Sequence, residues 1–250
     1  MSASNIWHPL LLELDRWQAA GRQASLWLRD DDAIEPTPAL ERLLSLTGSH
    51  HIPVALAVIP AHTGERLARH LDSAPHTTVV VHGWSHRNYA SPQEKKQELG
   101  LHRPPEVVLE ELAKGLTLLE ELHRLRIQPV LVPPWNRIDS RLVPELEGLG
   151  YEALSVYGPE KTGTIRQINT HVDLMDWHGT RGGRPHDVLA LELAANLART
   201  FESGGAVGFL THHLVHDEMA WGFLEELFAV MEAHPGCRWH SIGDVPGATG

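Results

Sequence analysis

Residues 25–32 read SLWLRDDD, and residues 77–86 read TTVVVHGWSH. In each stretch an apolar run with the length of a buried strand ends directly in side chains that can bind a metal ion. Asp32 ends the first stretch, whereas His82 and His86 end the second. Parallel α/β folds gather functional residues at the carboxyl ends of their strands, so this pattern favours such a fold.

Apolar runs alternate with longer segments of helical periodicity along the chain, which is typical of consecutive βα units. Because the runs are apolar on both faces, they fit parallel strands better than an antiparallel sandwich. We expect a parallel α/β barrel, with an open doubly wound sheet as the alternative. The predicted strands are Ser25–Arg29, Val54–Ile59, Thr77–Val81, Pro129–Val132, Ala153–Tyr157, His171–Leu174, Val207–Leu210 and Arg238–Ile242. The predicted helices are Thr37–Leu46, Glu106–Leu125, Arg141–Leu149, Val188–Phe201 and Met219–Ala233.

The 250 residues and the apolar content of 42% are sufficient for one large core. We therefore expect a single domain over residues 1–250, with a helical lead-in at residues 1–24. Residues 87–105 and 157–169 are predicted to be long loops over the active face.

Composition excludes several classes of function. The net charge is -11 and the Lys and Arg residues are scattered, so we expect no nucleic-acid partner. Cys237 is the single cysteine, which excludes an intrachain disulfide and a Cys-rich zinc module. The first residues lack a basic segment before an apolar one, and no apolar run approaches the ~20 residues of a membrane helix. We expect a cytoplasmic protein without a membrane partner; its oligomeric state is not predicted.

Further polar clusters follow three more predicted strands, and all of these strand ends should converge on one face. The clusters are Pro133–Arg137, Asp173–His178 and Thr211–His213, the last running on to His216 and Asp217.

His82 and His86 are four residues apart, so their imidazoles share one side if the chain begins a helical turn there. Two histidines and one carboxylate leave open positions for water and substrate, and zinc is the default ion, although Co, Fe or Mn also suit these ligands. Two surface or capping histidines are the alternative, which the acidic triplet elsewhere disfavours.

The three adjacent aspartates at positions 30–32 would repel one another unless a cation or hydrogen bonds held them. One carboxylate can bind a metal ion while its neighbour takes a proton from water. A solvated loop or the N-cap of the next helix is the alternative reading.

Residues 25–245 resemble the polysaccharide deacetylase superfamily, the NodB-like proteins of carbohydrate esterase family four, and the resemblance implies the distorted (β/α)7-type barrel of that family. The family's TFDDG motif aligns with Asp31 and Asp32, which implies that Asp31 is the catalytic base and Asp32 a metal ligand. A shift of one residue, which would involve Asp30, stays open. The motif His-Ser/Thr-x-x-His matches the metal ligands His82 and His86, with glycine in place of the hydroxyl residue.

The family's third motif, Arg-x-Pro-Tyr, is matched by Pro134 and Trp135, but Val132 stands where the arginine should be. In the family this arginine pairs with the catalytic aspartate. Arg29 or Arg137 could replace it; for Arg137, a loop cap or a surface ion pair is an equally favoured reading.

The fourth motif, Asp-x-x-Asp-Trp, matches Asp173, Asp176 and Trp177, and the resemblance implies that Trp177 forms a wall of the substrate pocket. The fifth, Leu-x-His, implies that His212 is the general acid, with His213 as the second candidate. We expect substrate binding by Trp135, Arg137, Asp173, Asp176 and Trp177. His178, His216 and Asp217 could support the site residues, but their nearness to these motifs in the sequence is the one reason to consider them.

The resemblance implies a metal-dependent hydrolase that removes an acyl group, N-acetyl above all, from a saccharide or related small amide. The missing arginine motivates a competing hypothesis, a non-catalytic metal- or carbohydrate-binding protein. A third reading is a hydrolase of carbon–nitrogen bonds in linear or cyclic amides that are not sugars.

Overall fold

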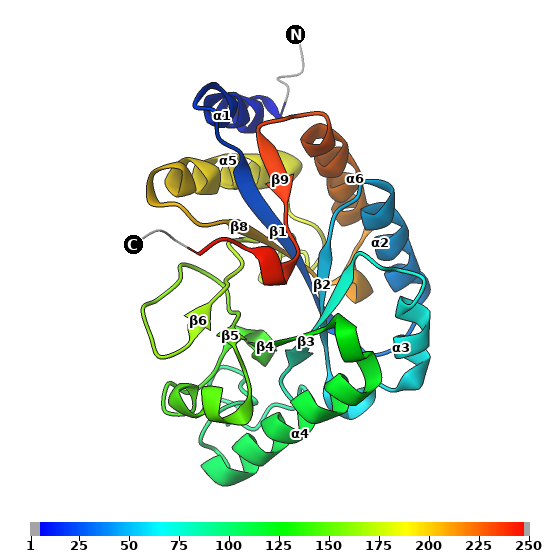
Figure 1. Cartoon of the computed structure of the whole chain (residues 1–250), viewed down its shortest axis with the longest axis vertical. Coiled ribbons are helices and arrows are strands. Elements are labelled where there is room, and N and C mark those ends of the chain that lie inside the picture. Colours follow the sequence, from blue (N-terminus) through cyan, green and yellow to red (C-terminus); the bar gives the residue numbers. More distant parts are fainter. Residues whose placement is uncertain (1–5, 248–250) are drawn as a thin grey trace. The chain divides into compact units, whose positions relative to one another are not determined.

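The computed structural model describes residues 6–247, which form an α/β fold (Figure 1). Its contacts divide the chain into two compact units. Among the described residues, unit 1 comprises 6–29, 38–54 and 171–247, and unit 2 comprises 30–37 and 55–170. Strand β1, Ala24–Ala33, passes from unit 1 into unit 2 after Arg29. The single-domain expectation stays a prediction.

Unit 2 holds a run of adjacent strands in the order β6-β5-β4-β3-β2. The pairs β3–β4, β4–β5 and β5–β6 are parallel, and His82 at the end of β3 is opposite Val132 at the end of β4. Helix α4 packs along β3 and β4, and α3 packs against α4 (Figure 1). The elements are β2 (Val54–Val58), α3 (Glu65–Leu71), β3 (Thr77–His82), α4 (Pro105–His123), β4 (Ile127–Val132), β5 (Ala153–Leu154) and β6 (Arg166–Gln167).

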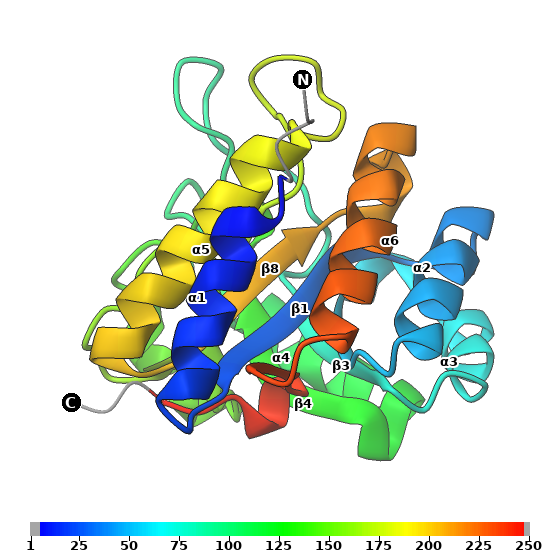
Figure 2. The same cartoon turned by 90° about the horizontal axis from the view of Figure 1, so that it is seen from above.

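Unit 1 contains the first part of β1, which pairs in parallel with β9, and the parallel pair β7–β8. Helices α1 and α5 lie side by side in both views (Figures 1 and 2). Helix α1 buries Leu10, Leu14 and Trp17, which share one face because they are three or four residues apart. The elements are α1 (His8–Ala19), α2 (Pro38–Ser49), β7 (Val172–Asp173), α5 (His186–Ser203), β8 (Val207–Thr211), α6 (Glu218–Glu232) and β9 (Cys237–Trp239).

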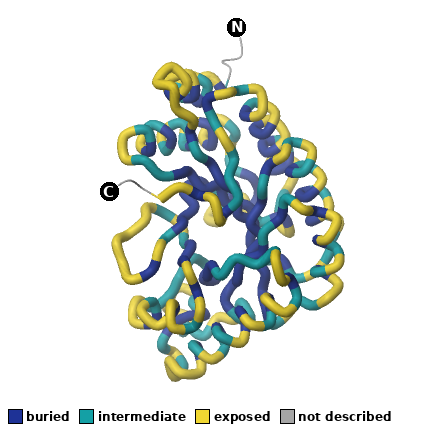
Figure 3. Tube along the Cα trace, viewed as in Figure 1, coloured by how far each residue is buried: buried dark blue, intermediate teal, exposed yellow. Residues whose placement is uncertain are grey.

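The strands β2 and β8 are buried along their whole length, as are most residues of β1 and β3 (Figure 3). Burial on both faces is what parallel strands covered by helices require. The α/β class and the parallel strands predicted from the sequence are confirmed. Among the residues that the structure describes, none of the helices combines the length and the apolar character that a membrane crossing needs.

Several predicted elements differ from the structure, and strand β6 lies within the loop predicted at residues 157–169. The helix expected at Arg141–Leu149 is two short 3₁₀ turns, Val143–Glu145 and Glu147–Leu149, since Pro144 cannot donate a backbone hydrogen bond. Strand β1 continues through the acidic triplet instead of ending at Arg29. The segment between His82 and His86 forms no helical turn.

Candidate metal centre

Asp32 lies near the carboxyl end of β1, in unit 2, with a backbone φ of 74°. Aspartate is among the few residues that adopt this left-handed conformation readily. Its neighbours Asp30 and Asp31 are buried, at 0% and 3% exposed, so the triplet is not a solvated loop. The local strand therefore places acidic groups inside the molecule.

His82 is the last residue of β3 and is 1% exposed. Its Nδ1 lies 2.9 Å from the carbonyl oxygen of Val132, which also accepts a hydrogen bond from the Gly83 amide at 3.1 Å. A carbonyl oxygen can only accept, so Nδ1 is the protonated nitrogen. The other ring nitrogen, Nε2, is 3.1 Å from Oδ1 of Asp32. His82 is thus held with Nε2, the nitrogen that can bind a metal ion when it is unprotonated, toward the carboxylate.

His86 follows a turn in which Gly83 has a φ of 56° and His86 itself a φ of 55°. Its Nε2 is 3.3 Å from the same Oδ1 of Asp32. The ring contacts the indole of Trp135, with centroids 4.4 Å apart. The left-handed backbone at Gly83 and His86 brings the two imidazoles together. The helical turn expected from their spacing is therefore wrong.

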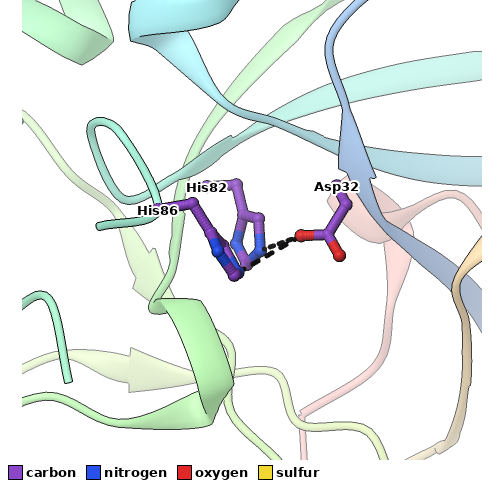
Figure 4. A group of neighbouring side chains, drawn as sticks. All are labelled: Asp32, His82 and His86. Atoms are coloured by element: carbon purple, nitrogen blue, oxygen red, sulfur yellow. Dashed lines mark hydrogen bonds and ion pairs between the residues drawn. The ribbon is translucent and has the colours of Figure 1, made fainter. Parts of the chain in front are cut away.

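Asp32, His82 and His86 converge (Figure 4). One ligand atom from each lies within 4.8 Å of the others, and among residues 6–247 these are the three side chains grouped in this way. Bonds of ~2.1 Å to a common ion would place neighbouring ligand atoms about 3.0–3.4 Å apart. The two distances to Asp32, 3.1 and 3.3 Å, fall in that range. The donor set and spacing therefore fit a divalent metal ion.

The two histidines have opposite pKa shifts without a metal ion. Burial lowers the pKa of His82, but the hydrogen bond that its ring donates to Asp32 and the charges of Asp31 and Asp32 outweigh burial and raise it. Burial and the neighbouring His82 lower the pKa of His86. The lowered pKa favours the neutral form of His86, which can bind a metal ion, whereas a cation would replace the proton shared by His82 and Asp32.

The third-motif segment lies beside this triad in unit 2. Trp135 and Asn136 both have left-handed backbone, with φ of 55° and 56°. The indole of Trp135 contacts His86, and the Lys96 ammonium is 5.8 Å from its centroid. Arg137 donates a hydrogen bond to the Lys96 carbonyl oxygen at 2.9 Å, which is the loop-capping contact considered from the sequence.

The fourth- and fifth-motif residues lie in unit 1. Asp173, at the end of β7, accepts a hydrogen bond from the Trp177 indole at 2.8 Å. The Trp177 ring packs edge-on against His212, with centroids 4.6 Å apart. Asp176 instead accepts the Gly179 and Thr180 amides, each at 3.0 Å. Asp173, Trp177 and His212 thus form one contact group, while Asp176 shapes a turn.

The neighbouring polar residues have structural contacts. His213 is 1% exposed, so it does not face solvent, and His216 Nε2 accepts the His212 amide at 3.2 Å. Asp217 caps α6 by accepting the Ala220 amide at 2.9 Å. His178 is exposed. Asp217 therefore has a structural role at the start of α6.

Glu98 was not among the residues that the sequence pointed to, yet it contacts the turn between the two histidines. It is 0% exposed, and its carboxylate accepts hydrogen bonds from Trp84 and Ser85. In the sequence, Glu98 is one acidic residue in a segment predicted to be a loop. The apolar residue Leu99 next to it is the one sign that this position could be buried.

Comparison with known proteins relates the fold to one family of solved structures. A protein of Mycobacterium smegmatis named as a polysaccharide deacetylase has a TM-score of 0.67 and 18% identity, over 89% of this chain and 88% of that one. A peptidoglycan N-acetylglucosamine deacetylase, Bc1960, has a TM-score of 0.55 and 15% identity, over 88% and 86%. A family 4 acetyl xylan esterase of Clostridium thermocellum, solved with cobalt, has a TM-score of 0.51 and 11% identity, over 88% and 89%.

No family model and no curated protein matches the sequence. The structural comparisons show that the chain has the fold of the polysaccharide deacetylases of carbohydrate esterase family 4. The fold implied by the sequence resemblance is confirmed.

Proposed function

We propose that this protein is a metal-dependent hydrolase that removes an acyl group, N-acetyl in the first place, from a saccharide or related small amide. The convergence of Asp32, His82 and His86 is the observation on which the proposal rests. The deacetylase fold supports it, and so does the cobalt in the structure of the acetyl xylan esterase.

Asp32, His82 and His86 would hold a divalent cation, zinc by default and cobalt, iron or manganese as alternatives. Such an ion supplies positive charge that polarises a carbonyl group and acidifies water. The left-handed backbone at Asp32 and His86 supports a binding role, because strained conformations of this kind concentrate at functional sites.

Asp31 is the proposed base, which takes a proton from the attacking water. The oxygen of that water bonds to the acyl carbon, the carbon–nitrogen bond breaks, and His212 gives a proton to the departing amine. The products are a carboxylic acid and a free amine. The charge of Asp31 acts on the pKa values of His82 and His86, which supports its nearness to the triad.

Trp135, Arg137, Asp173, Asp176 and Trp177 are the residues that we propose for substrate binding. Trp177 is 39% exposed, unusual for so large an apolar ring, and an exposed indole can stack on the apolar face of a sugar. Its hydrogen bond to Asp173 fixes the ring plane. Arg137 and Asp176 have the weaker support, since both make the local backbone contacts described above.

A non-catalytic metal- or carbohydrate-binding protein is the second candidate. Val132 is buried where the resembled motif has an arginine, and this departure from the motif favours the binding protein. Hydrolysis of carbon–nitrogen bonds in other linear or cyclic amides is the third.

Turnover of a panel of N-acetylated amino sugars tests the proposal, with O-acetylated sugars and simple linear and cyclic amides alongside. We expect release of acetate from an amino sugar, loss of activity with a chelator, recovery with zinc or cobalt, and no activity in His82→Ala. Metal binding without turnover of any compound would favour the binding protein. Turnover of the non-sugar amides alone would favour the third reading.

A further inference from the structure

We propose that Glu98 is a positioning residue for the metal centre: its buried carboxylate fixes the turn at residues 83–86 so that His86 points at Asp32. The inference rests on the proposed metal-dependent function, and it adds a residue outside the five motifs.

The contacts of Glu98 are all directed at the turn. Oε1 accepts hydrogen bonds from the Ser85 amide at 2.7 Å and from the Ser85 hydroxyl at 2.8 Å, and Oε2 accepts the Trp84 amide at 3.2 Å. The side chain is 0% exposed, so these three donors stand in for the water that a carboxylate would otherwise bind. Glu98 therefore binds two consecutive peptide groups lying between the two metal ligands.

The turn needs an external support because its own backbone is unfavourable. His86 has a φ of 55°, which a residue with a side chain seldom adopts, and the segment has no helical turn to satisfy its amides. Such a conformation persists when the surroundings hold it in place. The carboxylate of Glu98 is positioned to do this, since it binds the amides directly before His86.

Gly83 completes the arrangement. A Cβ at this position would lie 2.2 Å from Oε2 of Glu98 and 2.7 Å from Cδ of Pro134. The carboxylate thus occupies the space that a side chain at position 83 would need. Glycine at position 83, where the resembled motif has a hydroxyl residue, and glutamate at position 98 fit each other as a pair.

Glu98 is itself anchored on both sides. Gln97 exchanges hydrogen bonds with the segment just after His86: its amide donates to Asn88 at 2.9 Å, and its carbonyl accepts the Tyr89 amide at 3.0 Å. Leu99, 1% exposed, bridges to Ile138, and its carbonyl accepts the Asp139 amide at 2.8 Å. The predicted loop is therefore fixed where Glu98 enters the site.

Glu98→Gln tests the proposal, because the amide keeps the shape but replaces one acceptor oxygen with a donor. Glu94→Gln is the matched control: Glu94 belongs to the same loop and accepts from Ser91, but it is exposed and binds outside the turn. We expect Co²⁺ affinity to fall roughly 10–100-fold in Glu98→Gln, the usual range for a partner that orients a metal ligand, and to change less than about twofold in Glu94→Gln.

The visible spectrum of the Co²⁺ form separates positioning from a role in folding. In Glu98→Gln we expect its bands to shift toward those of His86→Ala, whereas a residue needed for folding alone would lower the unfolding temperature and leave the spectrum unchanged. Ser85→Ala removes one of the three hydrogen bonds and should weaken Co²⁺ binding about three- to tenfold, which keeps the test valid if Glu98→Gln folds poorly.

Wild-type Co²⁺ affinity and spectrum in a folded Glu98→Gln or Ser85→Ala would overturn the positioning role and leave the proposed function standing. A wild-type protein that binds no Co²⁺ or Zn²⁺ would overturn both.

Discussion

Nδ1 of His82 lies 2.9 Å from the carbonyl oxygen of Val132, at the position where the resembled motif has its arginine. The main chain of residue 132 therefore orients a proposed metal ligand, whatever the side chain of that residue is. The absence of an arginine at position 132 leaves this orientation intact and bears on the proposed base alone. Metal binding and catalysis can thus be tested separately.

Alanine at His82 or His86 should lower zinc occupancy at least ~10-fold, because each removes one of the three proposed ligands and the remaining two would bind weakly. Metal content of the purified, dialysed protein measures this. His178→Ala is the matched control, an exposed histidine from another motif, and should keep full occupancy. Equal occupancy in all three variants would show that the metal is bound elsewhere.

His212→Ala should lower kcat by about 10²–10⁴-fold with metal content unchanged, because a general acid acts in the chemical step without binding the ion. His213→Ala should retain most of kcat but lose stability, because His213 is 1% exposed. Steady-state kinetics and thermal unfolding of both variants check this. The reverse pattern, with His213 essential for turnover, would move the acid by one residue.

Arg29→Met should reduce kcat more than Arg137→Met. Arg29 is 0% exposed and stands two residues before Asp31 in β1, and side chains two apart in a strand share a face. Arg137 already binds the Lys96 carbonyl oxygen. A pH profile of kcat/KM provides the readout, since an arginine that holds the base ionised should shift the acidic limb to higher pH when removed. A larger loss in Arg137→Met would reverse the assignment.

Much of the fold follows from apolar periodicity. The runs at Val54, Thr77 and Val207 are continuous and apolar, and the structure has strands there within one or two residues of the predicted ends. Helices α4, α5 and α6 begin and end within about two residues of prediction because their apolar residues recur at helical spacing. The seven-residue helix α3 was missed, since so short a segment has little periodicity to detect.

The site was predictable where it depends on residue type and not where it depends on backbone shape. Aspartate and histidine at strand ends predicted the grouping of Asp32, His82 and His86, but the spacing of four residues does not predict the φ of 55° at His86. Strand β1 runs through three acids because tertiary contacts override their low strand propensity. Glu98 was missed because one acid in a polar segment resembles any solvated side chain.

His123 should make the protein less stable in acid. Burial, followed by the charge of Arg126, lowers its pKa to about 4, below the ordinary value of 6.5. The unfolded chain binds this proton more readily, so the stabilising contribution is complete above pH 6.5 and is lost as the pH falls toward 4. We expect about 1–2 kcal/mol less stability at pH 5 than at pH 7 from this group, measured by urea unfolding with chelator present. His123→Leu should remove that part of the pH dependence; an unchanged slope would contradict the prediction.

Asp31→Asn and Asp32→Asn should separate the two roles in the acidic triplet. Oδ1 of Asp32 is within 3.1 and 3.3 Å of the two histidine nitrogens, so its replacement by an amide should weaken metal binding and, through it, activity. Asp31 is 3% exposed and acts on the same histidines through its charge, so Asp31→Asn should keep the metal and lose kcat by about 10²–10⁴-fold, since a base is needed for the chemical step alone. Zinc content and kcat measured on the same preparations give both quantities. If Asp31→Asn instead lost the metal while Asp32→Asn retained it, the roles would shift by one residue and Asp30 would become the base.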